Sequence, residues 1–247
     1  MKKEFHFSID DVFESLIEVS DKNMPIKKHY FFKILYTLWK KHKIKTGLHL
    51  FYQKEIQGRI RTLKEVRNLE KELRENWIYF NIHGLDPETP PYKQTIKEQK
   101  KTFDKISKEI SRFSNKKYFT SFTRLHHYSE SFELKEYFKK KKIQGLFSTD
   151  RKVGSHRMSK KSSLRLIEKG EVKFKGMNFF RTDFRVEWLE KENLKDIKTN
   201  FIDTLRKKNK IIIYSHEYEL KRKNIRKTLM KLMGMLSKDL KLVCQKP

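Results

Sequence analysis

The chain has 247 residues, and its 59 Lys and Arg against 31 Asp and Glu give a formal net charge of +28. Only 36% of the residues are hydrophobic, but 19 Phe, 10 Tyr and 3 Trp recur in clusters that can bury a core, which argues against disorder. The 8 Gly and 5 Pro exclude collagen-like and low-complexity classes, and the single Cys244 excludes an intrachain disulfide or a cysteine-built zinc cage.

The N-terminal sequence MKKEFHFSID contains no apolar segment of the kind that signal peptides carry. The sequence contains no run of about 18 apolar residues, so it predicts no membrane span. We therefore expect a cytoplasmic protein. Most basic residues are Lys spread along the chain, whereas base-reading proteins rely on Arg, which argues against nucleic acid as a partner. A surface that attracts polyanions is the alternative interpretation of the charge.

Strand-like and helical segments alternate along the whole chain. In chain order, the pattern predicts a strand at 4–9 and a helix at 26–43, then strand 47–52 and helix 62–76, strand 77–82 and helix 95–113, strand 118–125 and helix 131–142, strand 143–147 and helix 159–169, strand 172–180 and helix 194–208, and strand 211–214 and helix 222–236. Seven such units without a linker predict an α/β fold, a single (β/α)7-type barrel domain over residues 1–247. An open doubly wound sheet is the alternative, but no Gly-rich loop follows the first strand.

Polar residues gather where these strands end, which is where (β/α) barrels carry their chemistry. They are Asp10 and Asp11 after the first strand, His83 and Asp86 after the third, Arg124, His126 and His127 after the fourth, Asp150, His156 and Arg157 after the fifth, Arg181, Asp183, Arg185, Glu187 and Trp188 after the sixth, and Ser215, His216 and Glu217 after the seventh. Several histidines that converge on one rim predict a metal or acid–base site.

The adjacent carboxylates Asp10 and Asp11 allow two interpretations. One carboxylate can bind a divalent metal while the other takes a proton from water. Alternatively, an Asp of the pair is the N-cap of a helix that begins near Val12, since Asp is a favoured N-cap residue.

These residues, in order along nearly the whole chain, resemble the motifs of the polysaccharide deacetylases of the family-four carbohydrate esterase type. Ser8-Ile9-Asp10-Asp11 stands where that family has Thr-Phe-Asp-Asp, and His83-Gly84-Leu85-Asp86-Pro87 stands where it has His-Ser-x-x-His. Arg124-Leu125-His126 takes the place of the family's Arg-x-Pro, and the strand from Ile211 to His216 matches its last strand, which ends in His. The segment from Asp183 to Trp188 loosely resembles the family's Asp followed by Asp-Trp. The second motif keeps its first histidine, and Pro87 replaces the second.

The resemblance implies a (β/α)7 barrel and a metal-dependent hydrolase that removes an N-acetyl group from a glycan or a glycan precursor. It implies that Asp10 is the catalytic base, that Arg124 clamps Asp10, and that His216 protonates the leaving amine. It also implies that Asp11 and His83 bind a divalent metal, expected to be Zn²⁺.

The third metal ligand has two candidates, because Pro87 cannot bind. His126 comes from the next strand and can approach without a long loop, whereas the proline after Asp86 biases Asp86 towards an extended backbone. We therefore favour His126 and keep Asp86 as the alternative. Three protein ligands leave a zinc site open for substrate.

Candidate substrate-binding residues lie on the loops near the same rim. They are Tyr92, His127, Tyr128, His156, Arg157 and Trp188, of which Trp188 is either a core residue or a platform for a sugar ring. The expected partner is a carbohydrate, including anionic glycans.

Two further function classes stay open. The lost second histidine suits a non-catalytic carbohydrate-binding barrel of the same family. The charge of +28 suits a basic protein that binds nucleic acid or another polyanion, although no helix-turn-helix, RNA-binding aromatic motif or zinc finger supports it.

Overall fold

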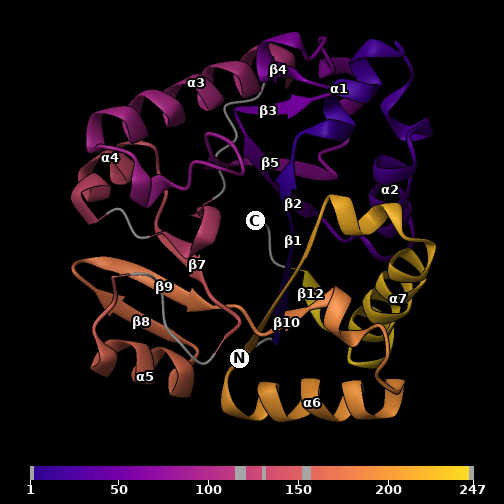
Figure 1. Cartoon of the computed structure of the whole chain (residues 1–247). Coiled ribbons are helices and arrows are strands. Elements are labelled where there is room, and N and C mark those ends of the chain that lie inside the picture. The colour runs from indigo at the N-terminus through magenta and orange to yellow at the C-terminus, as the bar shows by residue number, and fades with distance from the viewer. Residues whose placement is uncertain (1–2, 115–120, 130–131, 152–156, 245–247) are drawn as a thin grey trace.

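The structure, a computed structural model, describes residues 3–114, 121–129, 132–151 and 157–244 (Figure 1). Its strands are β1 (Glu4–Val12), β2 (Thr46–Phe51), β3 (Gln53–Ile56), β4 (Arg59–Thr62), β5 (Ile78–Gly84), β6 (Phe122–Thr123), β7 (Gly145–Ser148), β8 (Glu171–Phe174), β9 (Met177–Arg181), β10 (Phe184–Arg185), β11 (Lys210–His216) and β12 (Val243–Cys244). Its α-helices are α1 (Glu14–Asp21), α2 (Tyr30–His42), α3 (Ile96–Ser114), α4 (Lys135–Lys140), α5 (Lys160–Lys169), α6 (Leu194–Lys207) and α7 (Lys223–Gly234).

Two sheets form the centre of the molecule. The larger sheet is all parallel, in the order β10-β11-β1-β2-β5, with β12 beside the start of β1. The smaller sheet has the order β6-β7-β9-β8 and is parallel except for the β8–β9 pair. The predicted α/β architecture with parallel strands and outer helices is therefore confirmed.

The two sheets follow each other as in a (β/α)7 barrel but do not close into one hydrogen-bonded ring within the described residues. Side chains join β5 to β6, because Asn81 Nδ2 donates to the Phe122 carbonyl at 2.9 Å and Thr123 Oγ1 donates to the Ile82 carbonyl at 2.5 Å. On the other side, β9 passes into β10 without a ladder between them. The fold is thus a barrel-like arrangement of two curved parallel sheets.

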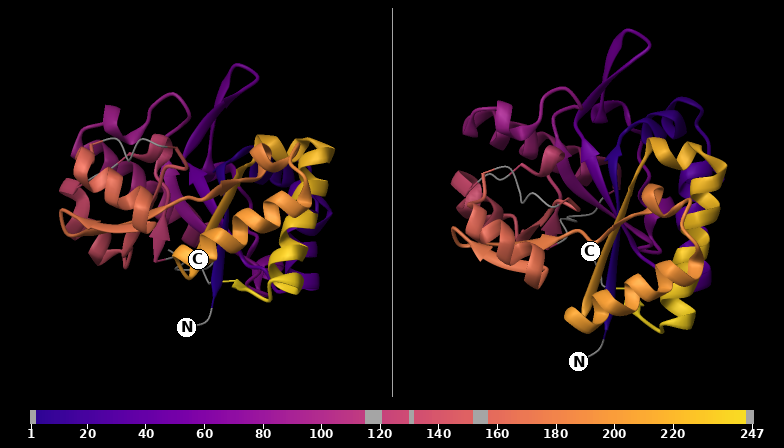
Figure 2. Two further views of the ribbon diagram at one scale, coloured as in Figure 1. Left: turned by 90° about the horizontal axis from the view of Figure 1, so that it is seen from below. Right: turned by 60° about the horizontal axis from the view of Figure 1, so that its bottom comes forward.

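Helices cover the outside of the sheets, and one hydrophobic cluster runs through the whole domain (Figure 2). Helix α3 shows why these segments are helical. Its buried residues Phe103, Ile106, Ile110 and Phe113 recur at spacings of three and four, which places them on one face. That face packs on β5, where the Phe113 ring meets Phe80 edge-on at a centroid distance of 5.1 Å.

The predicted helix at 62–76 is wrong. The β3–β4 hairpin, whose two-residue turn has left-handed backbone at Gln57 and Gly58, ends at Thr62. The chain then continues through short 3-10 turns at Leu63–Glu65 and Glu70–Leu73 in place of the helix. The apolar residues are buried as expected, because successive turns can also present residues inwards every three or four positions. They are Leu63, Val66, Leu69 and Leu73.

Three other expectations need adjustment. The predicted strand at 172–180 is a hairpin, β8–β9, which turns at Lys175 and Gly176 with positive φ angles. The predicted strand at 118–125 is reduced to β6, and residues 118–120 of it lie outside the described residues. Helix α1, which the sequence places near Val12, begins at Glu14. Within the described part of the chain, no helix combines the length and apolar character that crossing a bilayer requires.

Candidate active site

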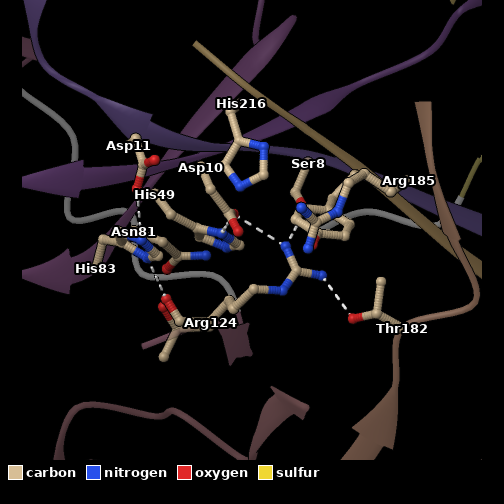
Figure 3. A network of polar contacts seen from close by, with 12 residues as sticks. Ser8, Asp10, Asp11, His49, Asn81, His83, Arg124, Thr182, Arg185 and His216 are labelled. Carbon is tan, nitrogen blue, oxygen red and sulfur yellow. Dashed lines mark hydrogen bonds and ion pairs between the residues drawn. The ribbon is translucent and has the colours of Figure 1, made fainter. Parts of the chain in front are cut away.

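One cavity of about 330 Å³ collects the predicted chemical groups at the carboxyl ends of the strands. Its lining includes Asp10, Asp11, His83, Arg124, His126 and His216, which come from the ends of β1, β5 and β11 and from the segment after β6. Figure 3 shows Asp10, Asp11, His83, Arg124 and His216 pointing towards one another. Residues that span most of the sequence therefore share one site, as the parallel strand arrangement predicts.

A β-bulge turns both carboxylates of β1 into this cavity. Successive side chains of a regular strand point to opposite faces. Asp11, however, has left-handed backbone with φ of 61°, and the register of β1 against β2 shifts between Ile9 and Val12. The bulge thus explains how adjacent residues can serve one site.

The alternative role of the pair as a helix N-cap is excluded by the start of α1. The helix begins at Glu14, and its first backbone N–H groups are bound by the carboxylate of Glu217 instead. Glu217 accepts from the N–H groups of Phe13, Glu14 and Ser15 at 2.7 to 3.0 Å. Asp10 and Asp11 are therefore free to act in the cavity.

Asp10 is buried and held through one of its two oxygens. Its Oδ1 accepts from Arg124 Nη1 at 2.9 Å and from His49 Nδ1 at 2.6 Å, while Oδ2 has no partner among the described residues. Burial alone would raise the pKa of this carboxyl. The charge of Arg124 and the hydrogen bond from His49 outweigh it and hold the pKa of Asp10 well below its usual value. Asp10 is consequently ionised, with one oxygen available to a ligand.

Arg124 ties the two sheets together beneath the cavity. The side chain is only 1% exposed, and its Nη1 also donates to Ser8 Oγ at 3.0 Å while Nη2 donates to Thr182 Oγ1 at 3.0 Å. Its guanidinium lies over the Tyr214 ring, 4.3 Å from the ring centre. The buried charges of Arg124 and Asp10 therefore compensate each other within a hydrogen-bonded network.

Asp11, His83 and His126 form a compact cluster. The Nε2 atom of His83 lies 3.0 Å from Asp11 Oδ1 and 3.3 Å from His126 Nδ1, and His126 Nδ1 lies 3.8 Å from Asp11 Oδ1. One ligand atom from each residue thus lies within 4.8 Å of the others, as a common metal ion would require.

Backbone carbonyls fix which nitrogen of each histidine carries the proton. His83 Nδ1 donates to the Arg124 carbonyl at 2.7 Å, and His126 Nε2 donates to the Pro87 carbonyl at 3.0 Å. A carbonyl oxygen can only accept, so these nitrogens are protonated, and the other ring nitrogen of each histidine, which faces Asp11, is the one that could bind a metal. Burial, together with the neighbouring His83, lowers the pKa of His126 to about 4 and keeps this ring neutral.

The contact between His83 Nε2 and Asp11 Oδ1 is a hydrogen bond when that nitrogen is protonated, and a divalent cation would take the place of this proton. Burial raises the pKa of Asp11, but the hydrogen bond and charge of His83 lower it further, so the carboxylate is ionised. A carboxylate and two imidazole lone pairs at this separation fit a divalent cation such as Zn²⁺, with three protein ligands and an open position. Carbonyls that orient metal-binding histidines are typical of such sites.

The structure selects between the two candidates for the third position. Asp86, the alternative, lies outside the cluster: its Oδ1 accepts from the N–H groups of Glu88 and Thr89, and its Oδ2 accepts from Gln53 Nε2 at 3.0 Å. The carboxylate is used to close its own loop, as Asp side chains often are before a turn. His126 is the residue that reaches Asp11. The Pro87 carbonyl accepts a hydrogen bond from His126 Nε2 and so orients that ring.

His216 lies opposite this cluster and is paired with Glu187. In the parallel ladder, His216 is the register partner of Asp10, so the two side chains flank the same cavity. Its Nδ1 lies 2.6 Å from Glu187 Oε1. Burial favours the neutral ring, but the Glu187 hydrogen bond and the charges of Asp10 and Glu187 raise the pKa of His216 above its usual value. His216 therefore retains its proton to higher pH than a free histidine.

The predicted substrate-binding residues divide into three groups. His127 and Tyr128 line the cavity, and both have left-handed backbone. Tyr92 contacts the His127 ring at a centroid distance of 6.2 Å and lies outside the cavity lining. Trp188 is 54% exposed, so it is not a core residue, and the guanidinium of Arg185, which lines the cavity, lies 4.4 Å from its ring centre.

Two of the remaining predictions are corrected. Arg157 does not line the cavity, because its guanidinium pairs with both oxygens of Glu133 at the surface. Asp183 does not belong to the site either, since it pairs with Lys208 at 2.6 Å and accepts from the Ile212 N–H. The carboxylate near the cavity is Asp150, which binds Arg185 and the Tyr214 hydroxyl. His156 lies outside the described residues.

Sequence reasoning missed His49, Arg151 and Tyr218. The pattern places His49 inside a strand, yet the side chain is buried beside Asp10 on the neighbouring strand β2. Its imidazole within the apolar run GLHLFY was a signal that could have found it, because such a group needs a polar partner. Arg151 and Tyr218 line the cavity from loops, and nothing in their local pattern indicates this.

No family model and no curated protein matches the sequence. The fold is similar to that of a CE4 family pseudoenzyme from Bacillus anthracis, with 11% identity, 98% of this chain and 63% of that chain covered, and a TM-score of 0.55. It is also similar to a peptidoglycan N-acetylglucosamine deacetylase, with 13% identity, 99% and 86% covered, and a TM-score of 0.54. This chain has a polysaccharide deacetylase-like fold.

The deacetylase-like fold alone does not decide the activity. The same fold comparison matches a 4-alpha-glucanotransferase from Thermococcus litoralis, with 12% identity, 98% of this chain and 37% of that chain covered, and a TM-score of 0.58. A mutant of the pseudoenzyme is described as having restored enzymatic activity, and this chain spans 65% of that mutant's length. Enzymes and a pseudoenzyme thus share the fold, so activity has to be argued from the residues in the cavity.

Proposed function

We propose that the protein is a metal-dependent hydrolase that removes an N-acetyl group from a glycan or a glycan precursor. The observation that carries the proposal is the convergence of Asp11, His83 and His126, whose carboxylate oxygen and two ring nitrogens lie within 4.8 Å of one another. A divalent cation would join these three ligand atoms and displace any proton that lies between them. Solved structures with the same fold include a peptidoglycan N-acetylglucosamine deacetylase, which supports an N-acetyl sugar as the substrate.

A divalent metal held by these three residues would act as a Lewis acid that draws electron density from the acetyl carbonyl and acidifies water. The remaining chemistry falls to side chains of this chain. The carboxylate of Asp10 is positioned to accept the proton of the attacking water, since its Oδ2 is unpartnered among the described residues and its low pKa keeps it ionised.

His216 is suited to the second proton transfer. Cleavage of the amide releases an amine, which must receive a proton as it leaves. The imidazole lines the same cavity, and Glu187 fixes its Nδ1–H, so its Nε2 is the atom that can deliver a proton. Its raised pKa keeps it protonated to higher pH than a free histidine, as suits a general acid.

The surroundings of the cavity suit a sugar. Tyr218 stacks on the His216 ring at a centroid distance of 5.1 Å and lines both this cavity and an adjoining groove of about 640 Å³. Asp11 also lines both, so the groove leads directly to the proposed metal position. An exposed aromatic face next to polar groups offers a platform for a glycan that extends beyond the reacting sugar.

The second candidate function is a non-catalytic carbohydrate-binding barrel, because the fold is shared with a pseudoenzyme. Metal content and hydrolysis separate the two candidates. We expect the purified protein to bind one divalent metal per chain and to release acetate from N-acetylglucosamine oligomers. Asp11→Ala should lose the metal and lower activity by about 100- to 1,000-fold.

Asp86→Ala is the matched control for this experiment. It removes a neighbouring carboxylate that binds only its own loop and Gln53, so it should retain the metal and most of the activity. A wild-type protein that binds N-acetyl sugars but neither retains a metal nor releases acetate would establish the non-catalytic barrel instead.

A further inference from the structure

Two neighbouring outer helices, α2 and α7, enclose a groove with an apolar floor. They pack side by side on the same flank of the larger sheet in both views (Figures 1 and 2). The groove measures about 550 Å³, and Tyr30, Ile34, Thr37 and Met230 line its floor. It is separate from the proposed active site, whose cavity shares none of these residues.

The rim of this groove is entirely basic. Lys33 of α2 and Lys223, Lys227 and Lys231 of α7 surround it, and none of these four forms an ion pair with a residue that the structure describes. The fifth cation, Arg226, is used differently, since it donates to the carbonyls of Leu220 and Lys221.

The flank formed by α2 and α7 is more uniformly basic than another exposed helix of the protein, α6. Neither α2 nor α7 contains an Asp or a Glu, whereas the exposed helix α6 carries Asp196 and Asp203 among its lysines. Acids beside the two helices are already paired, Glu75 with Lys27 and Lys40, and Glu219 with Arg222. The four rim lysines thus remain as an uncompensated cluster around an apolar surface.

We propose that this α2–α7 groove docks the protein on an anionic lipid bilayer. Lysine stems can lie along apolar surface while their ammonium groups reach lipid phosphates, and the groove floor offers space for part of an acyl chain. Juxtaposed basic and apolar groups are the combination that anionic bilayers bind, because each phosphate-facing Lys adds attraction and the apolar floor adds burial. Nucleic acid would engage the lysines but leave the apolar floor exposed.

The groove begins near the end of the barrel that carries the cavity. The docking proposal does not depend on the proposed hydrolysis. Helix α7 follows β11 through the short turn at Tyr218–Lys221, so its first residues lie near the end of the barrel that carries His216. The groove begins at the first residue of each helix, Tyr30 and Lys223, and extends to Thr37 of α2 and Lys231 of α7. A docked molecule would therefore hold the carboxyl end of the sheet close to the bilayer.

Vesicle co-sedimentation tests the proposal. The intact chain is mixed with vesicles of phosphatidylcholine alone or with added phosphatidylglycerol, at physiological ionic strength. We expect binding only to the vesicles that contain phosphatidylglycerol. The triple variant Lys33→Glu/Lys227→Glu/Lys231→Glu should bind these vesicles at least about 100-fold more weakly, from about 1 kcal/mol lost per lysine.

A matched variant changes the same charge elsewhere. Lys195→Glu/Lys198→Glu/Lys207→Glu alters three exposed lysines of α6, and we expect less than about a fivefold loss, because none of them lines the groove. Equal losses in both triple variants would overturn the proposal, because net charge alone would then explain the binding.

Met230→Gln tests the apolar floor with little change in volume. It should weaken vesicle binding several-fold, and unchanged binding would refute occupation of the groove by an acyl chain. Wild-type binding to duplex DNA without binding to either vesicle would refute the docking surface as a whole. Far-UV circular dichroism and thermal unfolding establish that each variant is folded before it is assayed.

Discussion

The two sheets of the barrel contribute to the site in different ways. The larger sheet is all parallel, with strands of six to nine residues at its centre, and it delivers Asp10, Asp11, His49, His83 and His216 from within β1, β2, β5 and β11. The smaller sheet has strands of two to five residues and an antiparallel edge, and it contributes Arg124 and His126 only from the segment after β6.

The difference shows that this site does not rely on one continuous ladder. In the larger sheet, strand register places the functional side chains, with the bulge at Asp11 as the exception. In the smaller sheet, hydrogen bonds across the gap position them instead. The Arg124 carbonyl binds His83, its guanidinium binds Asp10, and Asn81 binds the Phe122 carbonyl. The positions of the residues that follow β6 therefore depend on a few polar contacts between the two sheets, each of which can be removed singly.

Removing the Arg124 guanidinium should have the largest effect. Arg124→Ala leaves the carboxylate of Asp10 buried beside His49 without its cation and removes the links to Ser8 and Thr182. We expect the free energy of unfolding to fall by about 3–5 kcal/mol, as when one partner of a buried ion pair is lost. Urea unfolding measures this change. A loss below about 1 kcal/mol would show that the two sheets hold together without Arg124.

Changing His49 tests whether the regular sheet also positions the chemistry. His49→Ala removes the donor that fixes Asp10 Oδ1 but touches none of the three proposed metal ligands directly through a hydrogen bond. We expect kcat to fall by as much as about 100-fold through misplacement of the carboxylate, with KM and metal content nearly unchanged. His49→Asn keeps an N–H donor at a similar reach and should recover part of kcat. Loss of metal in His49→Ala would contradict this separation of roles.

Glu187 gives a smaller, pH-dependent effect. His216 must be protonated to act as a general acid, and Glu187 raises its pKa, so activity should extend to higher pH in the wild type. In Glu187→Gln the pKa of His216 falls, and the alkaline limb of the pH–activity profile should move to lower pH by about one unit. Steady-state rates across pH measure the shift. An unchanged alkaline limb would assign that limb to another group.

The smallest effect is expected from a change at Arg157, which precedes helix α5. Its ion pair with Glu133 is at the surface, so Arg157→Ala should change the free energy of unfolding by no more than about 0.5 kcal/mol and leave the activity intact. Comparison with Arg124→Ala then shows that position in the network, rather than charge, determines the contribution. A large loss of activity would return Arg157 to the substrate-binding residues.

Much of the larger sheet could be predicted from the sequence, because its strands are apolar runs that end in polar residues. Alternation located β1, and the buried run before His216 located β11. The 3-10 turns that follow the β3–β4 hairpin could not be predicted in this way, because the apolar spacing from Leu63 to Leu73 is compatible with a helix. Only the tertiary packing shows that short turns meet the same spacing.

The candidate site was predictable where it follows from strand ends, as with Asp10, His83 and His216. It was not predictable where it depends on partners distant in the sequence. His49 becomes part of the site through the register of β2 beside β1, and Glu187 acts through the ring of His216. Arg157 and Asp183 have suitable side chains at suitable positions in the pattern, but Glu133 and Lys208 engage them elsewhere.

The left-handed backbone at Asp11 gives two consecutive carboxylates opposite surroundings. Asp10 meets the cation of Arg124, whereas Asp11, one peptide further, meets the ring nitrogens of two histidines. With an ordinary extended backbone, the second carboxylate would point to the far face of the strand. The division of labour between proton acceptor and cation ligand therefore depends on the sign of a single main-chain dihedral angle.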